Sequence, residues 1–381
     1  MTAGHRAHGH ARGHPRGPIA VEQSVTETEL VAIVRQAAAA GLTMKAVGRF
    51  RSPTGPGAPA AGTSEGIIIS LAGYGRILRV DRDRHVVTVQ AGISLRALHH
   101  GLAARGLSLA NGPDNPIQSI GAAISTGAHG TGARFPGLAG ELVSLELITA
   151  TGELMACSAD ADESPDVFGA VRVGLGAVGV ISTVTVRCEP AFNLRRQIGL
   201  ARLEDVLASF DQQADGNDHF ELSWIAGTPW ARTFRANRTD EPRGADRSHR
   251  VFPDRRLRAD MVEYSLPRTA AVAAIGQLRG RGQQRGRAAP FPIRIRVTAG
   301  DDIPLSTANG RPSVYIAVPA GPLAQFLDEL GGRPQWTARH GATAATLCGR
   351  YPRWDEWHAV RQRLDPERRF ASAFTEAVLG T

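Results

Sequence analysis

The stretch from Ile117 to Gly132 has the residue types that a flat or phosphorylated ligand needs at close range. It reads IQSIGAAISTGAHGTG and contains four glycines and four serine or threonine residues. Glycine has no Cβ to hold a ligand away, and successive backbone N–H groups can converge on a bound group. The stretch therefore indicates a bed for a cofactor. A glycine-rich loop between two strands explains the same residues, and short motifs discriminate weakly between the two interpretations.

A second candidate lies where the apolar strand expected over 44–47 runs into the turn GRFRSPTGPG. A strand that leads into a glycine-containing turn is a usual setting for phosphate binding. Arg49 and Arg51 lie in this turn, and planar guanidinium groups match phosphate oxygens geometrically. The alternative is that both arginines point into solvent, and the sequence leaves the two possibilities open.

Arg294 and Arg296 form a third candidate, in a segment that is typical of a strand. Residues i and i+2 of a strand face the same side, so two guanidinium groups can face one pocket. Such a pocket would hold a carboxylate or a phosphate, with the proton acceptor supplied by one of Asp114, His129, Tyr315 and His340. An arginine face in solvent is the alternative for a strand that reads RIRV.

Helices and strands alternate irregularly around these candidates in the first half of the chain. A capping box of Ser24 and Glu27 predicts a helix over 25–40. Strands are expected over 44–47, 67–71, 77–80, 86–89 and 180–187, helices over 95–104 and 166–173, and a hairpin of 142–149 with 153–156. This order predicts an α+β unit of about 170 residues.

From about residue 191 the pattern is looser. Strands are expected over 220–225, 293–298 and 313–318, and a helix over 323–330, so a second α+β unit follows the first. Residues 239–291 are dominated by Arg, Gly and Asp, and we expect a mobile surface excursion there. An amphipathic helix over 355–364 is closed by Asp365-Pro366.

Composition restricts the class of protein. The 42% hydrophobic content is that of a globular chain, and no apolar run approaches the roughly 18 residues of a membrane helix, so no membrane partner is expected. Three widely spaced cysteines predict neither a disulfide framework nor a metal site, which favours the cytoplasm. The oligomeric state cannot be predicted from these features.

Charge and lysine content narrow the chemistry further. The net charge of +8 comes without an RNA-binding or zinc-finger pattern, so we interpret it as a composition bias and expect no nucleic acid partner. Lys45 is the only lysine, which excludes P-loop, pyridoxal and lysine-base chemistry unless that residue serves. Residues 1–18 contain four histidines that could chelate a metal, but their composition favours a disordered tail.

Four further segments carry a resemblance to a known family. They are VGRFRS at 47–52, LITATGELM at 147–155, VGLGAVGVISTVTV at 173–186 and YPRWDEWHAVRQRLDPERRF at 351–370. With them the chain resembles the sugar-1,4-lactone oxidase and alditol oxidase family, which belongs to the vanillyl-alcohol-oxidase type of FAD enzymes. The resemblance implies an α+β fold of two domains: an FAD-binding domain over 19–190 and a substrate or cap domain over 191–345. Residues 346–381 would return to the first domain.

The resemblance also implies a set of FAD contacts. The pyrophosphate side would be wrapped by Val47, Gly48, Arg49, Phe50, Arg51 and Ser52. The flavin would be lined by Asp114, Ser119, Gly121, Ala122, Ala123, Ile124, Ser125, His129 and Gly130, and Ile181 would contact the nucleotide end. The implied catalytic residues are Asp114, His129, Arg294 and Arg296, without a metal ion.

Several positions depart from the family pattern. Where the family reads Gly-Ser-Gly-His-Ser, with the histidine bonded to the flavin, this chain has Arg51 in place of that histidine, so the flavin is expected to bind without a covalent link. The family's Glu-x-Arg pair appears as Arg294 and Arg296, and the lysine of its His-Trp-Gly-Lys run is replaced by Ala338.

Three functions remain open on these residues. The first is an FAD-dependent oxidoreductase that takes a hydride from an alcohol or related C–H of a small metabolite other than the family's usual sugar, with an anionic metabolite as one option. The second is a sugar-1,4-lactone or alditol oxidase. The third is a relative without redox activity, which performs a redox-neutral step or only binds a ligand.

Overall fold

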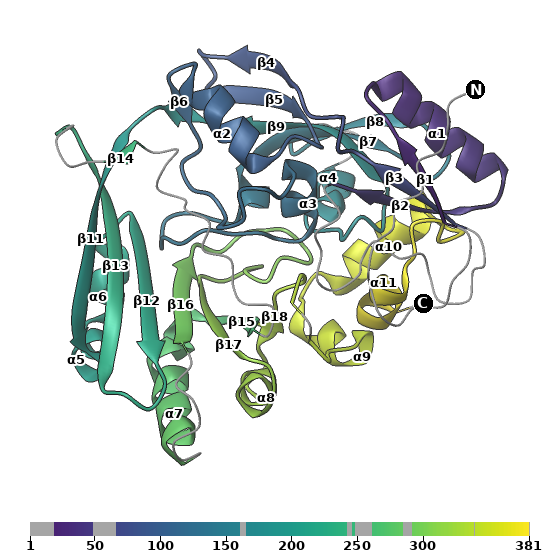
Figure 1. Cartoon of the computed structure of the whole chain (residues 1–381). Helices are drawn as coiled ribbons and strands as arrows, with labels where there is room; N and C mark the ends of the chain where they lie inside the picture. The colour runs from purple at the N-terminus through teal and green to yellow at the C-terminus, as the bar shows by residue number, and fades with distance from the viewer. Residues whose placement is uncertain are drawn as a thin grey trace.

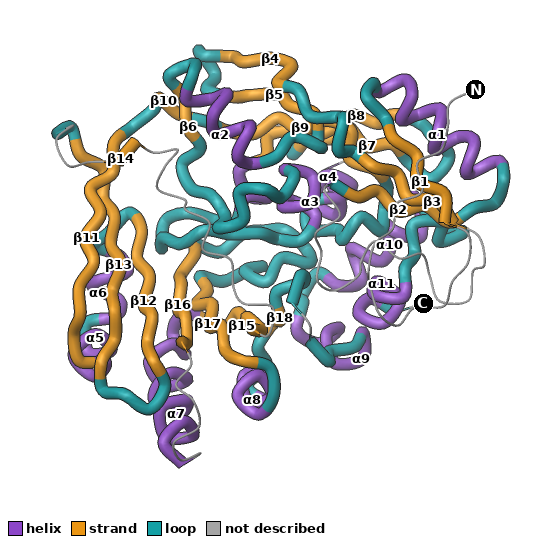
Figure 2. Tube along the Cα trace, viewed as in Figure 1, coloured by secondary structure: helices purple, strands orange, loops and turns teal. Residues whose placement is uncertain are grey.

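The computed structural model describes residues 19–48, 66–160, 165–241, 246–247, 261–284, 292–338 and 340–380. Two lobes meet along a band of loops, which Figure 2 shows in teal between the strands of one lobe and those of the other. The predicted turn residues Arg49 to Ser52, and the tail over 1–18, lie outside the described residues.

The first lobe contains two sheets. A parallel three-stranded sheet has the order β1-β3-β2, from β1 (Ile19–Gln23), β3 (Gly66–Ser70) and β2 (Thr43–Val47). An antiparallel five-stranded sheet has the order β4-β5-β9-β7-β8, with bounds Ile77–Asp81, Val86–Gln90, Val180–Arg187, Leu142–Ile148 and Leu154–Ser158. Alternate residues of β5 and β9, such as Val87, Val89 and Val184, are fully buried, so one face of this sheet forms the core.

Four helices pack with these sheets in one hydrophobic core. They are α1 (Glu27–Ala39), α2 (Leu95–Ala103), α3 (Ile120–Ser125) and α4 (Pro165–Val171). Two short strands, β6 (Leu107–Ser108) and β10 (Glu189–Pro190), pair where the chain leaves for the second lobe. All strands and helices expected before residue 190 are confirmed to within a few residues.

The second lobe is an eight-stranded sheet with the order β14-β11-β13-β12-β16-β17-β15-β18, seen at the lower left of Figure 1. The strands are β11 (Asn193–Arg202), β12 (His219–Ile225), β13 (Trp230–Thr239), β14 (Asp246–Arg247), β15 (Met261–Pro267), β16 (Pro292–Thr298), β17 (Ser313–Pro319) and β18 (Arg333–Pro334). Helices α5 (Leu203–Ala208), α6 (Phe210–Asp215), α7 (Ala271–Gln284) and α8 (Pro322–Glu329) share a core with one face of the sheet.

The chain then returns to the first lobe, as expected. Helices α9 (Ala344–Leu347), α10 (Trp354–Leu364) and α11 (Ala373–Leu379) lie at the lower right of Figure 1. The N–H of Met44 in β2 donates to the carbonyl of Arg369, between α10 and α11, at 2.7 Å. The fully buried Trp357 of α10 donates from Nε1 to the carbonyl of Ala170 in α4 at 3.0 Å. Its indole therefore joins the C-terminal segment to the first core.

Two expectations from the sequence are wrong. The capping box of the first helix is Thr26 with Glu29, not Ser24 with Glu27, because Ser24 still pairs with Ser70 of β3 through its backbone N–H. The stretch 239–291 is not a surface excursion throughout, because it contains β15 and α7. Ile275 and Leu278 of α7 are fully buried, so a helix rich in Gly and Arg is held by its narrow apolar face.

Candidate active site

The glycine-rich stretch forms a short helix rather than an open loop of free amides. Ser119 caps α3, and the N–H groups of Ile120 and Gly121 donate to Ile93 and Ala91 at 2.9 Å. The side chains of Ala123 and Ile124 are fully buried in the core, whereas Ala122 is half-buried. The expected convergence of amides on a ligand is therefore not found at these positions, and only the open side of α3 is available to one.

Two glycines are needed because backbone segments approach one another closely here. A side chain at Gly48, the last described residue after β2, would overlap the hydroxyl of Ser119. A side chain at Gly130 would overlap Asn111 and the carbonyl of Gly112. The end of β2 thus lies against the start of α3, and the loop before α3 lies against the loop after it, without room for a side chain in either contact.

The loop after α3 is joined directly to the second lobe. Gly132 donates its N–H to Val297 of β16 at 2.8 Å and forms a bridge with Thr298, and Ala299 donates to Phe135 at 2.9 Å. These backbone bonds fix the bed against the eight-stranded sheet. The side chains that meet at this junction therefore have a defined geometry.

Asp114 lies between the two predicted arginines. Its Oδ2 accepts from Nη2 of Arg294 and, at 2.9 Å, from Nη1 of Arg296. Glu221 of β12 lies 3.5 Å from Nε of Arg294. Both guanidinium groups thus have carboxylate partners within the protein, and the arginine face is buried rather than solvated.

Glu263 of β15 completes the cluster. Its Oε1 and Oε2 accept from Nη2 of Arg296 at 2.8 Å and 3.0 Å, and its Oε2 lies 3.1 Å from Nε2 of His129. Burial opposes the ionisation of Glu263, but Arg296 and His129 outweigh it and lower the pKa of the carboxyl to about 2. Glu263 is therefore a buried carboxylate.

His129 is held on three sides. Nδ1 lies 3.0 Å from the carbonyl of Gly130, Nε2 faces Glu263, and the ring of Tyr315 stacks on the imidazole at 3.6 Å between centroids. Burial and the charge of Arg296 lower the pKa of His129, against the opposing effect of Glu263. Both ring nitrogens of His129 thus lie within hydrogen-bond distance of groups of the protein.

The other predicted residues lie in different surroundings. Tyr315 is buried with its hydroxyl 2.8 Å from Thr307, and burial raises its pKa to about 12. His340 contacts Trp336 and Phe374 edge-on, and burial lowers its pKa to about 4. Ile181 lies in β9 in the first core, and Ser125 and Ala122 lie on the open side of α3.

Two acidic residues of this cluster, Glu221 and Glu263, were not predicted from the sequence. Each is a single carboxylate in an otherwise apolar strand, HFELSWI or MVEYSLP. A lone acidic residue within an apolar strand is the signal that could have found them, because a carboxylate is buried only with a partner. For Glu263 the signal was obscured because the strand lies in the arginine-rich stretch.

Unpartnered buried polar atoms around the junction fit a large polar cofactor. The atoms without a hydrogen-bond partner include Nδ2 of Asn111 and Oδ1 of Asn115. Buried polar groups of this kind are satisfied when a ligand is bound. Together with the glycine contacts at Gly48 and Gly130, they fit the polar edge of a flavin dinucleotide.

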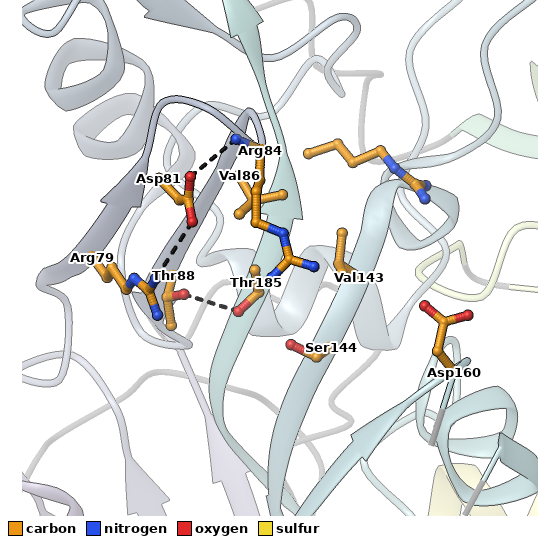
Figure 3. Close-up of a pocket in the computed structure, with 10 residues that line it drawn as sticks. Arg79, Asp81, Arg84, Val86, Thr88, Val143, Ser144, Asp160 and Thr185 are labelled. Atoms are coloured by element: carbon orange, nitrogen blue, oxygen red, sulfur yellow. Dashed lines mark hydrogen bonds and ion pairs between the residues drawn. The ribbon is translucent and has the colours of Figure 1, made fainter. Parts of the chain in front are cut away.

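A surface cavity of about 400 Å³ lies elsewhere, on the five-stranded sheet. Figure 3 shows Arg79, Asp81, Thr88 and Thr185 lining it. Thr88 and Thr185 alternate with the buried residues Val87, Val89, Val184 and Val186 of β5 and β9, so the cavity is on the outer face of that sheet and is separate from the junction. Within the described ranges, no cluster of His, Cys, Asp and Glu could hold a metal ion.

Comparisons with known proteins agree with this geometry. Residues 18–158 match the FAD binding domain family, and residues 184–252, 243–320 and 321–378 match the D-arabinono-1,4-lactone oxidase family. The chain belongs to the D-arabinono-1,4-lactone oxidase family of FAD-linked oxidoreductases. The resemblance seen in the sequence and the FAD-dependent oxidoreductase function expected from it are thereby confirmed.

Two relatives and one solved structure are similar to this chain over almost its whole length. An L-gulono-1,4-lactone dehydrogenase of Mycobacterium tuberculosis is 36% identical, over 95% of this chain and 96% of its own length. An L-gulonolactone oxidase of Bos taurus is 27% identical, over 92% of each chain. A cholesterol oxidase structure from B. sterolicum superposes with a TM-score of 0.77 at 16% identity, over 94% of each chain, which confirms the expected two-domain FAD fold. None of the helices in the described ranges could cross a bilayer.

Proposed function

We propose that this oxidoreductase oxidises a CH–OH group of an uncharged sugar-1,4-lactone, with Asp114 as the proton acceptor. The observation that carries the proposal is the position of Asp114, whose Oδ2 is held by Arg294 and Arg296 at the junction of the two lobes. Its Oδ1 has no hydrogen-bond partner among the residues that the structure describes. That oxygen is available to a substrate hydroxyl.

Charge supports an uncharged substrate over an anion. The two guanidinium groups were candidates to clamp a carboxylate or a phosphate, but each contacts protein carboxylates instead. An anionic substrate would have to displace Asp114 from them and leave a carboxylate without its partners, which is costly in a buried site. The names of the relatives, lactone dehydrogenases and oxidases, point to the same substrate class.

The chemistry divides between protein and cofactor. FAD, when bound, accepts a hydride from the substrate carbon. The protein takes the hydroxyl proton on Asp114 and uses Arg294 and Arg296 to hold that carboxylate in place. The C–H and O–H bonds are broken and a C=O bond is formed, so the substrate is oxidised by two electrons.

We further propose that the flavin is not covalently bound, because Arg51 stands where the family has its linking histidine. Residues 19–190 would hold the cofactor and 191–345 the substrate, with 346–381 supporting the first domain. Acid precipitation tests the link: yellow colour should move to the supernatant, and colour in the pellet would contradict the proposal. We propose a cytoplasmic location, because the three cysteines are free thiols.

The substrate is tested by anaerobic reduction of the flavin. A panel of sugar-1,4-lactones, alditols and hydroxy acids is mixed with the enzyme, and bleaching near 450 nm is followed. Lactones should bleach the wild type, Asp114→Asn should slow bleaching by about 100-fold or more, and hydroxy acids should be inactive. Bleaching by hydroxy acids alone would instead support an anionic substrate held by Arg294 and Arg296. Tight binding of a lactone without bleaching would favour a redox-neutral function.

A further inference from the structure

We propose that Glu263 is a positioning residue of the active site, whose carboxylate fixes Arg296 and His129 and, through Arg296, the proton acceptor Asp114. The inference rests on the proposed function for the role of Asp114. It adds a residue that neither the sequence pattern nor the comparisons assign.

Glu263 determines the orientation of the Arg296 guanidinium group. Nη2 is bound by both carboxylate oxygens of Glu263, and Nη1 then points at Oδ2 of Asp114 at 2.9 Å and at the carbonyl of His129 at 3.1 Å. A guanidinium group is planar and rigid, so fixing one nitrogen fixes the other. Glu263 thus sets where Arg296 meets Asp114.

The carboxylate is itself held firmly. Glu263 is 3% exposed, lies in the middle of β15, and accepts a backbone bond at its carbonyl from Gln335 at 2.8 Å. β15 pairs with β17, which carries Tyr315 against the imidazole of His129. The carboxylate therefore cannot move without disturbing two strands and the bed loop.

The charged groups that face this cluster come from three strands and two loops. Arg294 and Arg296 lie on β16, Glu221 on β12, Glu263 on β15, and Asp114 and His129 on the loops of the first lobe. Positive and negative groups alternate in the order Glu221, Arg294, Asp114, Arg296, Glu263, His129. Without the negative charge of Glu263, the positive charge of Arg296 is balanced only by Asp114. The pH at which Asp114 can accept a proton must therefore change.

The geometry also assigns His129 a supporting role. Nδ1 of His129 lies 3.0 Å from the carbonyl of Gly130, and Nε2 lies 3.1 Å from Glu263 and 3.4 Å from Nη2 of Arg296, so both ring nitrogens already face groups of the protein. Neither is left for a substrate hydroxyl. Glu263 therefore orients His129, and the acceptor is Asp114.

The test compares Glu263→Gln with Glu263→Asp, and uses Glu204→Gln, in an exposed ion pair with Arg202, as a matched control. The rate of anaerobic flavin reduction by L-gulono-1,4-lactone is measured across pH. Glu263→Gln should reduce the rate about 100-fold and move the acid limb to lower pH, and Glu263→Asp should restore the position of the limb and part of the rate. An unmoved acid limb in Glu263→Gln, with lower stability only, would overturn the proposal.

A second experiment tests the positioning role of Glu263 without a substrate. Urea unfolding is measured for Glu263→Gln, Arg296→Met and the double variant. The two substitutions should be strongly non-additive, with the double variant no less stable than the worse single variant. Additive effects would overturn the proposal. If no lactone bleaches the wild type, the proposed substrate fails, and this cycle still decides whether Glu263 fixes Arg296.

Discussion

Arg296 and Glu263 lie two strands apart in the sheet, on β16 and β15, yet their side chains form a buried ion pair across β17, in which both carboxylate oxygens accept from Nη2. In the register of the sheet, Ala317 lies between Glu263 and Arg294, whereas Tyr315 lies opposite Arg296, so the pair runs diagonally across β17. The arrangement explains how a site that has lost the family's strand glutamate at position 294 still has a carboxylate beside Arg296.

Acid should weaken the fold through Glu263. The pKa of this carboxyl is held near 2 instead of 4.5, mainly because Arg296 and His129 outweigh the cost of burial. A lowered carboxyl pKa gives stability that is complete above pH 4.5 and is lost as pH falls from 4.5 towards 2. The loss should be about 3 kcal/mol in urea unfolding. Glu263→Gln should be less stable at pH 7 and should lack this pH dependence; an equal acid slope in both proteins would contradict the prediction.

Lys45→Met should stabilise the protein at neutral pH. Lys45 is buried, and its Nζ donates to the carbonyl of Leu175 at 2.9 Å. Burial together with Arg361 lowers its pKa to about 8. The folded state therefore carries the cost of a buried charge below pH 8, and that cost disappears as pH rises to 10.5. Thermal or urea unfolding at pH 7 should show a gain of up to about 2 kcal/mol. The gain should shrink above pH 8, and a constant difference at all pH values would exclude this cause.

Gly48→Ala should weaken FAD retention. The added methyl group would overlap Ser119 and push its hydroxyl away from the N–H of Ala122, at the start of α3. Loss of this cap costs about 1 kcal/mol, and the bed is distorted in addition. The flavin-to-protein absorbance ratio after gel filtration measures the effect. Gly341→Ala, where a methyl group meets open space, is the control and should keep its flavin.

Two substitutions in α7 should have opposite effects on stability. Gly276→Ala adds a methyl group into open space within the helix and should stabilise by about 0.5–1 kcal/mol. Leu278→Ala removes a fully buried side chain and should destabilise by about 3 kcal/mol. Urea unfolding of both variants checks the prediction. Equal and small effects would mean that α7 does not pack as described.

The sequence alone determined the local elements and the general location of the site. Apolar periodicity, caps and turn residues predicted α1, β5, β9, β16 and α10, because these signals act within a few residues along the chain. The spacing along a strand singled out Arg294 and Arg296, and the family resemblance gave Asp114, His129, the cofactor and the two-domain FAD fold.

Tertiary structure decided which of these residues meet and what they can do. Asp114 and Arg294 are 180 positions apart, and Glu263 reaches His129 across 134 positions, so no local pattern could pair them. The helical form of α3, despite Gly121, depends on a core that buries Ala123 and Ile124. The packing of α7 likewise depends on the sheet beneath it. Burial and pairing are properties of distant segments brought together, and that is why the guanidinium groups expected to bind an anion are found bound to carboxylates of the protein itself.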